Sequence, residues 1–223
     1  VITLTRATGG RAPRFTGDGP TVADRVRQQM RHVLTRTEFP NYLDADAQTL
    51  LAEARATFRD LNLGQHAIVG TETETIVLPW RGDAVVATLA LAFTRHGLPA
   101  TADGLALTVA AGPAVTRAAA GEIAAQQQPD PHELASLVKY KERDKHDRYL
   151  DEELLTASFA TSLDVPGAWV ALRELAADPG PIMLDEPLAA LDAIEVTDAV
   201  TLAVLDECGF AVIDVATTGL AVN

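Results

Sequence analysis

The sequence predicts an α+β (or α/β) fold in which several helices cover a small mixed sheet. Short apolar strands alternate along the chain with longer stretches whose apolar residues recur at helical spacing. Hydrophobic residues make up 48% of the chain but aromatic residues only 5%, so the core must be built from Ala, Leu and Val, which suits helices packed on a modest sheet. At 223 residues the chain is long enough to bury such a core.

The first 128 residues are predicted to form an α+β accessory domain. Helices are assigned where apolar residues share one face, as Val26, Met30 and Val33 do, and strands where short apolar runs lie between turn residues. The expected elements are, in order, a helix over 22–36 capped by Thr21, a helix over 44–61, strands over 67–69 and 74–79, a turn at 80–82, a buried helix over 85–94, a strand over 105–109 and a helix over 113–127.

Two further regions are predicted after residue 128. Residues 129–177 form a helical region, and residues 178–223 form a short acidic α/β tail that begins at Pro179-Gly180-Pro181. The expected elements are helices over 131–138, 151–163 and 166–177, a strand over 182–185, a helix over 188–207 and a strand over 210–215.

Charge is distributed unevenly and restricts the possible partners. The net charge is −13, and residues 178–223 hold nine acidic residues and no Lys or Arg. An acidic chain is repelled by phosphate, so nucleic acid would bind only weakly and through local basic patches. The alternative is that these basic side chains are ordinary solvated charges. The candidate contacts are Arg11, Arg14, Arg25, Arg27 and Arg31 in the first patch and Lys139, Lys141 and Lys145 in the second.

The second patch also contains aromatic residues. Tyr140 and Tyr149 flank residues 141–148, in which basic and acidic side chains alternate. Aromatic rings beside basic residues can stack on bases while the cations contact phosphates. The competing interpretation is a solvated helix face whose charges pair with one another.

The single cysteine and the hydropathy pattern favour a cytoplasmic protein. Cys208 has no partner for an internal disulfide, and its acidic neighbours disfavour a reactive thiolate. No apolar run reaches the length of about 18 residues that a membrane span requires. The Ala-rich composition, with Arg preferred over Lys, is typical of a high-GC bacterium.

Residues 182–192 resemble the acidic strand end of ABC-type ATPases. Asp185 and Glu186 follow a predicted apolar strand, and Leu191-Asp192 match the end of the ATPase motif. The sequence contains no Gly-rich phosphate loop ending in Gly-Lys-Ser or Gly-Lys-Thr, and without it nothing holds the β- and γ-phosphates. We therefore expect no nucleotide cofactor in this chain, and the alternative is a strand, a turn and a capped helix.

Residues 209–220 resemble the first motif of the DEDD exonucleases, whose two carboxylates on one strand bind two divalent metals. Asp214 matches the first carboxylate and is the candidate metal ligand, but Ala216 occupies the position of the second. The segment is therefore interpreted as a truncated or inactivated start of a nuclease domain, or as an ordinary buried strand and turn.

A longer resemblance covers roughly residues 1–175. Its pieces, in order, are Gly9–Phe15, Asp24–Met30, Tyr42–Ala45, Leu50–Phe58, Leu78–Gly82, Asp103–Leu107 and Asp147–Leu155. Their order is similar to the region that follows the motor domains in large bacterial superfamily 2 helicases of the DEAD/DEAH and Lhr-like type. The resemblance implies a C-terminal accessory domain that flanks the nucleic-acid path of an ATP-driven translocase, with ATP and Mg²⁺ bound by the motor domains of the parent protein.

The sequence thus predicts an accessory, non-catalytic region of an ATP-dependent helicase or translocase, with nucleic acid and the motor domains or another protein as its partners. Two alternatives remain open. One is the stump of a metal-dependent exonuclease, and the other is an acidic protein–protein adaptor whose segment 178–223 docks on a basic partner.

Overall fold

A computed structural model describes residues 21–142 and 146–184 of the chain. These residues form an α+β fold, which confirms the predicted fold class, and the mixed sheet has five strands in the order β3-β4-β2-β1-β5. The strands are β1 (Ile68–Gly70), β2 (Thr75–Val77), β3 (Ala100–Asp103), β4 (Ala106–Val109) and β5 (Ile182–Met183).

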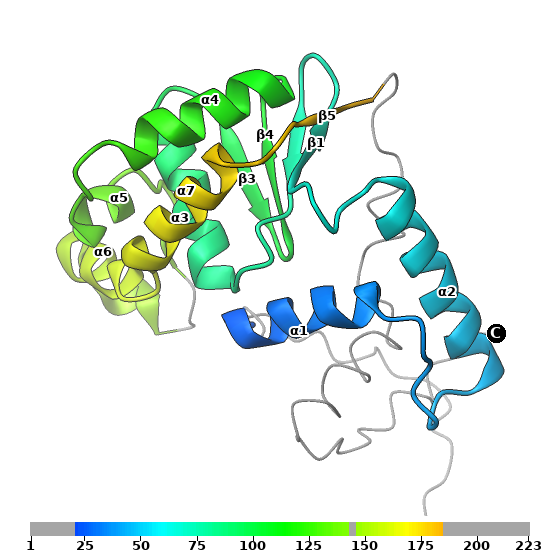
Figure 1. The fold of residues 1–223 in the computed structure, drawn as a ribbon. Helices are drawn as coiled ribbons and strands as arrows, with labels where there is room; N and C mark the ends of the chain where they lie inside the picture. The colour runs from blue at the N-terminus through cyan, green and yellow to red at the C-terminus, as the bar shows by residue number, and fades with distance from the viewer. Residues whose placement is uncertain (1–20, 143–145, 185–223) are drawn as a thin grey trace, which may run out of the picture.

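Helices lie on both sides of this sheet (Figure 1). The helices are α1 (Asp24–Thr35), α2 (Ala45–Asp60), α3 (Asp83–Arg95), α4 (Pro113–Ala124), α5 (Pro131–Ala135), α6 (Glu152–Ala160) and α7 (Val165–Ala176), with a 3-10 turn at Asp147–Tyr149. Figure 1 shows α3, α4 and α7 on one side of the sheet and α1 and α2 on the other.

The sheet is antiparallel except at one edge. β1 pairs with β2, β2 with β4, and β4 with β3 in antiparallel register, whereas β5 pairs with β1 in parallel, with Ile182 opposite Val69. This parallel pair places the chain that follows α7 at the edge of the sheet, beside β1.

Alternation along the strands gives the protein two separate cores. Side chains on one face, among them Ile68 and Val77, pack with α3, α4 and α7 around Phe93 and Leu172. Their neighbours in sequence point to the other face, where Val69 packs with α1 and α2. Successive residues of a strand point to opposite faces, so β1, β2 and β4 each contribute to both cores.

Capping side chains set where several helices begin. The Asp44 carboxylate accepts a hydrogen bond from the Ala47 amide at 2.8 Å, and Asp151 and Asp164 cap α6 and α7 in the same way. The first helix differs from the prediction, because its N-cap is Ala23, without a side-chain bond, and not Thr21. Its first turn is held by α3, as described below.

Two other details differ from the sequence prediction. Leu50, an apolar residue of the predicted helix over 44–61, is exposed on α2, and the buried face of this helix includes Arg55. Strand β3 was not predicted, because its polar and exposed residues carry no hydrophobic signal. Gly104, with φ of 51°, makes the tight turn from β3 into β4.

The described helices after residue 128 share the core of the preceding elements. α7 packs on α3 and α4 and contributes Trp169 and Leu172 to that core. The strand over 182–185 is present as β5, while the helix over 188–207 and the strand over 210–215 lie outside the described residues.

Candidate functional site

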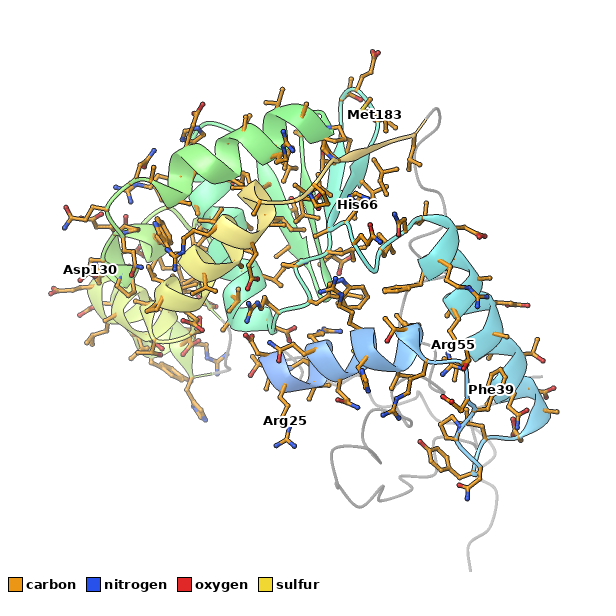
Figure 2. All side chains as sticks on the ribbon, viewed as in Figure 1. Arg25, Phe39, Arg55, His66, Asp130 and Met183 are labelled. Carbon is orange, nitrogen blue, oxygen red and sulfur yellow. The ribbon has the colours of Figure 1, made fainter. Side chains whose placement is uncertain are left out.

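The arginines of α1 have three different environments. Arg25 is exposed, and Figure 2 shows its side chain pointing away from the body of the protein. Arg27 is buried and pairs with Asp83 at 3.1 Å. Arg31 is half-buried and donates a hydrogen bond to the Gly64 carbonyl at 2.9 Å. Arg11 and Arg14 lie outside the described residues.

The second predicted patch contains two exposed tyrosines, each with a cation against its ring. The Tyr140 side chain is 82% exposed, with the Lys139 ammonium 5.4 Å from the ring centroid. Tyr149 is 72% exposed, with the Arg148 guanidinium 4.9 Å from its ring centroid. These four residues, here called the tyrosine surface, lie in the link between α5 and α6, at the end of the molecule opposite α2 (Figure 1).

Lys141 is not part of that surface. Its side chain is buried, and its ammonium forms an ion pair with Glu152 at the start of α6. The charge therefore holds the α5–α6 link in place and does not face solvent. Lys145 and Asp214 lie outside the described residues.

A reciprocal set of polar contacts joins the start of α1 to the start of α3. The Asp24 carboxylate accepts from the Gly82 amide at 2.6 Å, and the Asp83 carboxylate accepts from the Val22 amide at 2.8 Å. Each acid thus occupies the N-terminus of one helix while bonding the backbone just before the other, where negative charge is favourable. Any side chain at position 82 would meet the backbone of residues 22–24, so only glycine allows this approach.

Arg81 extends these contacts to α7. Its guanidinium donates to both oxygens of Glu174, at 2.7 and 2.8 Å, and to Asp24 at 3.3 Å. The hydrogen bond to Glu174 is the main reason why the pKa of Arg81 is raised, although burial acts in the opposite direction. Arg81 therefore stays charged and links α1, α3 and α7.

A pocket of about 500 Å³ lies where these elements meet. Its walls come from α1, from the loop before β1, from the turn between β2 and α3, and from the end of α7. The lining residues are Gln28, Arg31, Gln65, Ala67, Leu78, Pro79, Trp80, Arg81, Ala171, Glu174, Leu175, Ala177, Asp178 and Pro179. The volume lies within the usual range for small-molecule sites.

Asp178 is a buried carboxylate at one wall of this pocket. It accepts hydrogen bonds from the Ala67 amide at 2.7 Å, the Gly180 amide at 3.0 Å and His66 Nδ1 at 3.1 Å. Burial alone would raise its pKa, but these three donors outweigh burial and hold the pKa below its usual value. The carboxylate therefore stays ionised and fixes the loop before β1 against the end of α7.

Trp80 is the most strained residue of the pocket. Its backbone has φ of 53°, the left-handed region that side chains rarely adopt. The ring is buried and packs edge-to-face on Phe58, with the ring centroids 5.8 Å apart. Its buried Nε1 has no hydrogen-bond partner among the described residues. Contacts on both sides of residue 80 hold this conformation. The Leu78 amide donates to the Ala67 carbonyl at 2.8 Å, and Arg81 and Gly82 are both bonded to Asp24.

The tyrosine surface overlaps the second patch predicted from the sequence, whereas the pocket was not predicted. Within Leu78–Gly82, residues 78–79 are predicted as the end of a strand and residues 80–82 as a turn, and the segment is one piece of the helicase resemblance. The only signal in the sequence was an aromatic residue between Pro79 and Arg81-Gly82, and the partners on α1 and α7 are far away along the chain.

Neither of the two segments that resemble catalytic motifs, 182–192 and 209–220, forms a site in the described residues. Ile182 and Met183 form β5, and the acids that follow, with Asp214, lie outside those residues. Within residues 21–142 and 146–184, no group of three or more His, Cys, Asp or Glu side chains is arranged to hold a metal ion. None of the helices in this part of the chain has the length and apolar character that a membrane span requires.

Comparison with known proteins gives no relative. No protein-family model, no curated protein and no solved structure matches this chain. The α+β fold, the tyrosine surface and the pocket are therefore the observations on which a function is proposed.

Proposed function

We propose that this chain is an accessory, non-catalytic region of an ATP-dependent nucleic-acid helicase or translocase, and that its tyrosine surface contacts single-stranded nucleic acid. The observation that carries the proposal is the pair of exposed rings, Tyr140 and Tyr149, each with a cation beside it. Exposed aromatic rings beside cations are the combination of groups that binds single-stranded nucleic acid, so two such rings in one link favour this role.

The chemistry of this surface suits a flexible strand. Stacking of one base on an aromatic ring contributes about 1–3 kcal/mol and tolerates any sequence, because every base has a π-face. Lys139 and Arg148 lie close enough to their rings to meet the phosphate of a stacked nucleotide. The proposed contact is thus sequence-tolerant and uses few charges.

The overall charge makes the proposed contact weak when the chain acts alone. A net charge of −13 repels phosphate, so the tyrosine surface and the exposed Arg25 would act as local exceptions on an acidic protein. Such binding is sensitive to salt, because each phosphate contact releases counterions. An accessory region tolerates weak binding, since the motor domains would hold the strand nearby.

The binding of the nucleotide and its metal would take place in other parts of a longer protein. ATP and Mg²⁺ would be bound by motor domains in the parent protein, which are also the proposed protein partner of this chain. The proposed location is the cytoplasm, where such translocases act.

Fluorescence anisotropy of a labelled single strand in 50 mM salt tests the proposal. We expect weak binding by the full chain, and a loss of roughly tenfold or more when Tyr140 and Tyr149 are both changed to Ala, as expected for two lost stacking contacts. The matched control is Tyr42→Ala, because Tyr42 is the third tyrosine of the chain and lies between α1 and α2. No binding by the unmodified chain, or equal loss in the control, would contradict the proposed role.

A further inference from the structure

The pocket at Trp80 has the features of a binding site that the tyrosine surface does not use. Its walls combine an apolar part, made by Leu78, Pro79 and Leu175, with charged and amide side chains. Small-molecule sites commonly have this composition, in which an apolar wall holds the body of the ligand and a few polar groups fix its orientation.

The polar groups of the pocket are held in place before any ligand arrives. The bond from Arg31 to the Gly64 carbonyl orients its guanidinium, and this bond uses only one of the five N–H donors of the side chain. Glu174 is oriented by Arg81, which donates to both of its oxygens. A site whose groups are already oriented loses less conformational entropy when it binds.

The charges of the lining select against a simple anion. Arg31 and Arg81 are balanced by Glu174 and Asp178, so the charged side chains of the wall sum to zero. Arg81 and Asp178 also already have their partners within the protein. A neutral ligand that both donates and accepts hydrogen bonds therefore fits better than free phosphate.

We propose that this pocket binds one heterocyclic base, with guanine preferred. Guanine presents two acceptors, O6 and N7, which suit the fork of Arg31, and it presents N–H donors on its pairing edge that suit the free lone pairs of Glu174. The amide groups of Gln28, on α1, and Gln65, in the loop before β1, also line the pocket. The apolar part of the wall takes the face of the base.

The base has two possible sources, a free nucleotide or one unit of a bound strand. The second source rests on the proposed contact with nucleic acid, whereas the first does not. Binding of a mononucleotide therefore tests the pocket by itself, and binding of an oligonucleotide tests whether a strand reaches it.

The experiment uses the two tryptophans of the chain as reporters. Trp80 lines the pocket, whereas Trp169 is a buried residue of α7 whose indole N–H donates to the Gln126 carbonyl. In a Trp169→Phe background, we expect GMP to change the Trp80 fluorescence with saturation, and AMP, CMP and UMP to bind more weakly. Calorimetry on the unmodified chain provides the same comparison without the core substitution.

Two arginine variants provide the matched test. We expect Arg31→Gln to weaken GMP binding by at least about tenfold, the loss typical of a bidentate arginine–guanine pair. Arg59→Gln removes the same charge at an exposed position on α2, outside the pocket, and should leave GMP binding unchanged. The proposal is overturned if GMP does not bind, if inorganic phosphate competes as well as GMP does, or if the two variants lose equally.

The same variants distinguish a failure of this inference from a failure of the proposed function. If Arg31→Gln abolishes GMP binding but leaves the anisotropy of a guanine-containing oligonucleotide unchanged, the pocket binds free nucleotides and the strand stays on the tyrosine surface. If both signals fall, one base of the strand occupies the pocket. Loss of strand binding only in the Tyr140 and Tyr149 double variant leaves the base site intact.

Discussion

The face of the sheet under α3, α4 and α7 and the face under α1 and α2 bury different kinds of side chain. The first core is apolar, and threonines such as Thr88 and Thr116 provide its buried polar groups. The second core buries two arginines, Arg27 and Arg55. The strained Trp80 also lies on this second side, and the pocket lies where α1 on this side meets the end of α7 on the other.

The difference follows from how each layer is connected. The three helices of the first face pack directly on one another and on the strands, and burial of apolar area stabilises that layer without directional contacts. On the second face, α1 and α2 are held by individual polar contacts, from Asp24 and Asp83 to α3 and from Arg55 to the backbone that joins the two helices. A layer built in this way has room for a pocket and should respond locally when one contact is removed.

The largest effect is expected in the apolar core. Phe93 on α3 is fully buried, and Phe93→Ala should lower the free energy of unfolding by about 3–5 kcal/mol, because it leaves a cavity in a packed interior. Chemical denaturation measures this loss. If the first face governs the stability of the whole fold, fluorescence and circular dichroism should lose signal together. A loss below about 1 kcal/mol would mean that this core is not tightly packed.

A smaller effect is expected at Arg55, in the second core. Its guanidinium donates to the Val33 carbonyl at 3.0 Å and to the Glu38 carbonyl at 3.0 Å, and it lies 5.1 Å from the centre of the Phe39 ring. Figure 2 shows Arg55 and Phe39 side by side between α2 and the chain that precedes it. Arg55→Ala should cost about 2–3 kcal/mol, because buried carbonyls lose a charged donor.

The location of the Arg55 effect distinguishes the two faces. Hydrogen exchange should become faster in α1, α2 and their connection, while α3, α4 and α7 keep their protection. Equal loosening of both faces would contradict the view that they are held separately.

The helices of the first face were more predictable from the sequence than the buried contacts of the second. The apolar periodicity of 85–94, 113–127 and 166–177 indicated the helices that form it, because apolar packing leaves a periodic signal in the sequence. Arginine carries no such signal, so Arg27 was interpreted as a surface contact although it is buried against Asp83. The pocket was not predictable for a related reason, since Arg31, Trp80 and Asp178 are brought together only by the fold.

The next prediction concerns the pH dependence of the hydrogen bonds between Asp178, just after α7, and the loop before β1. The pKa of Asp178 is lowered in the folded protein, so its stabilising contribution is complete above the ordinary aspartate value of about 3.9. The contribution is lost as the pH falls through the lower folded value, because the protonated carboxyl no longer favours the amides of Ala67 and Gly180. Unfolding of the wild type and of Asp178→Asn should be compared from pH 5 to pH 2.

The difference in unfolding free energy between these two proteins should be constant near pH 5, at about 1–2 kcal/mol for the lost charged hydrogen bonds, and should shrink below pH 4. A difference that grows as the pH falls would show that Asp178 is stabilised in its protonated form.

The smallest effect is expected at Arg59, one helical turn after Arg55 on α2. Arg59 is exposed, so Arg59→Ala removes the same charge at the surface and should change stability by no more than about 0.5 kcal/mol. Thermal unfolding of this variant beside Arg55→Ala measures how much of the arginine effect comes from burial. A similar loss in both variants would mean that net charge, and not the buried contact, stabilises the second face.

Photocross-linking tests the proposed function most directly, because it maps the contact itself. A single strand that carries 5-iodouracil is irradiated with the full chain, and the cross-linked peptides are identified by mass spectrometry. The account predicts cross-links at Tyr140 and Tyr149 that disappear as salt is raised. Cross-links confined to the exposed side of α2, or no cross-link at low salt, would contradict it.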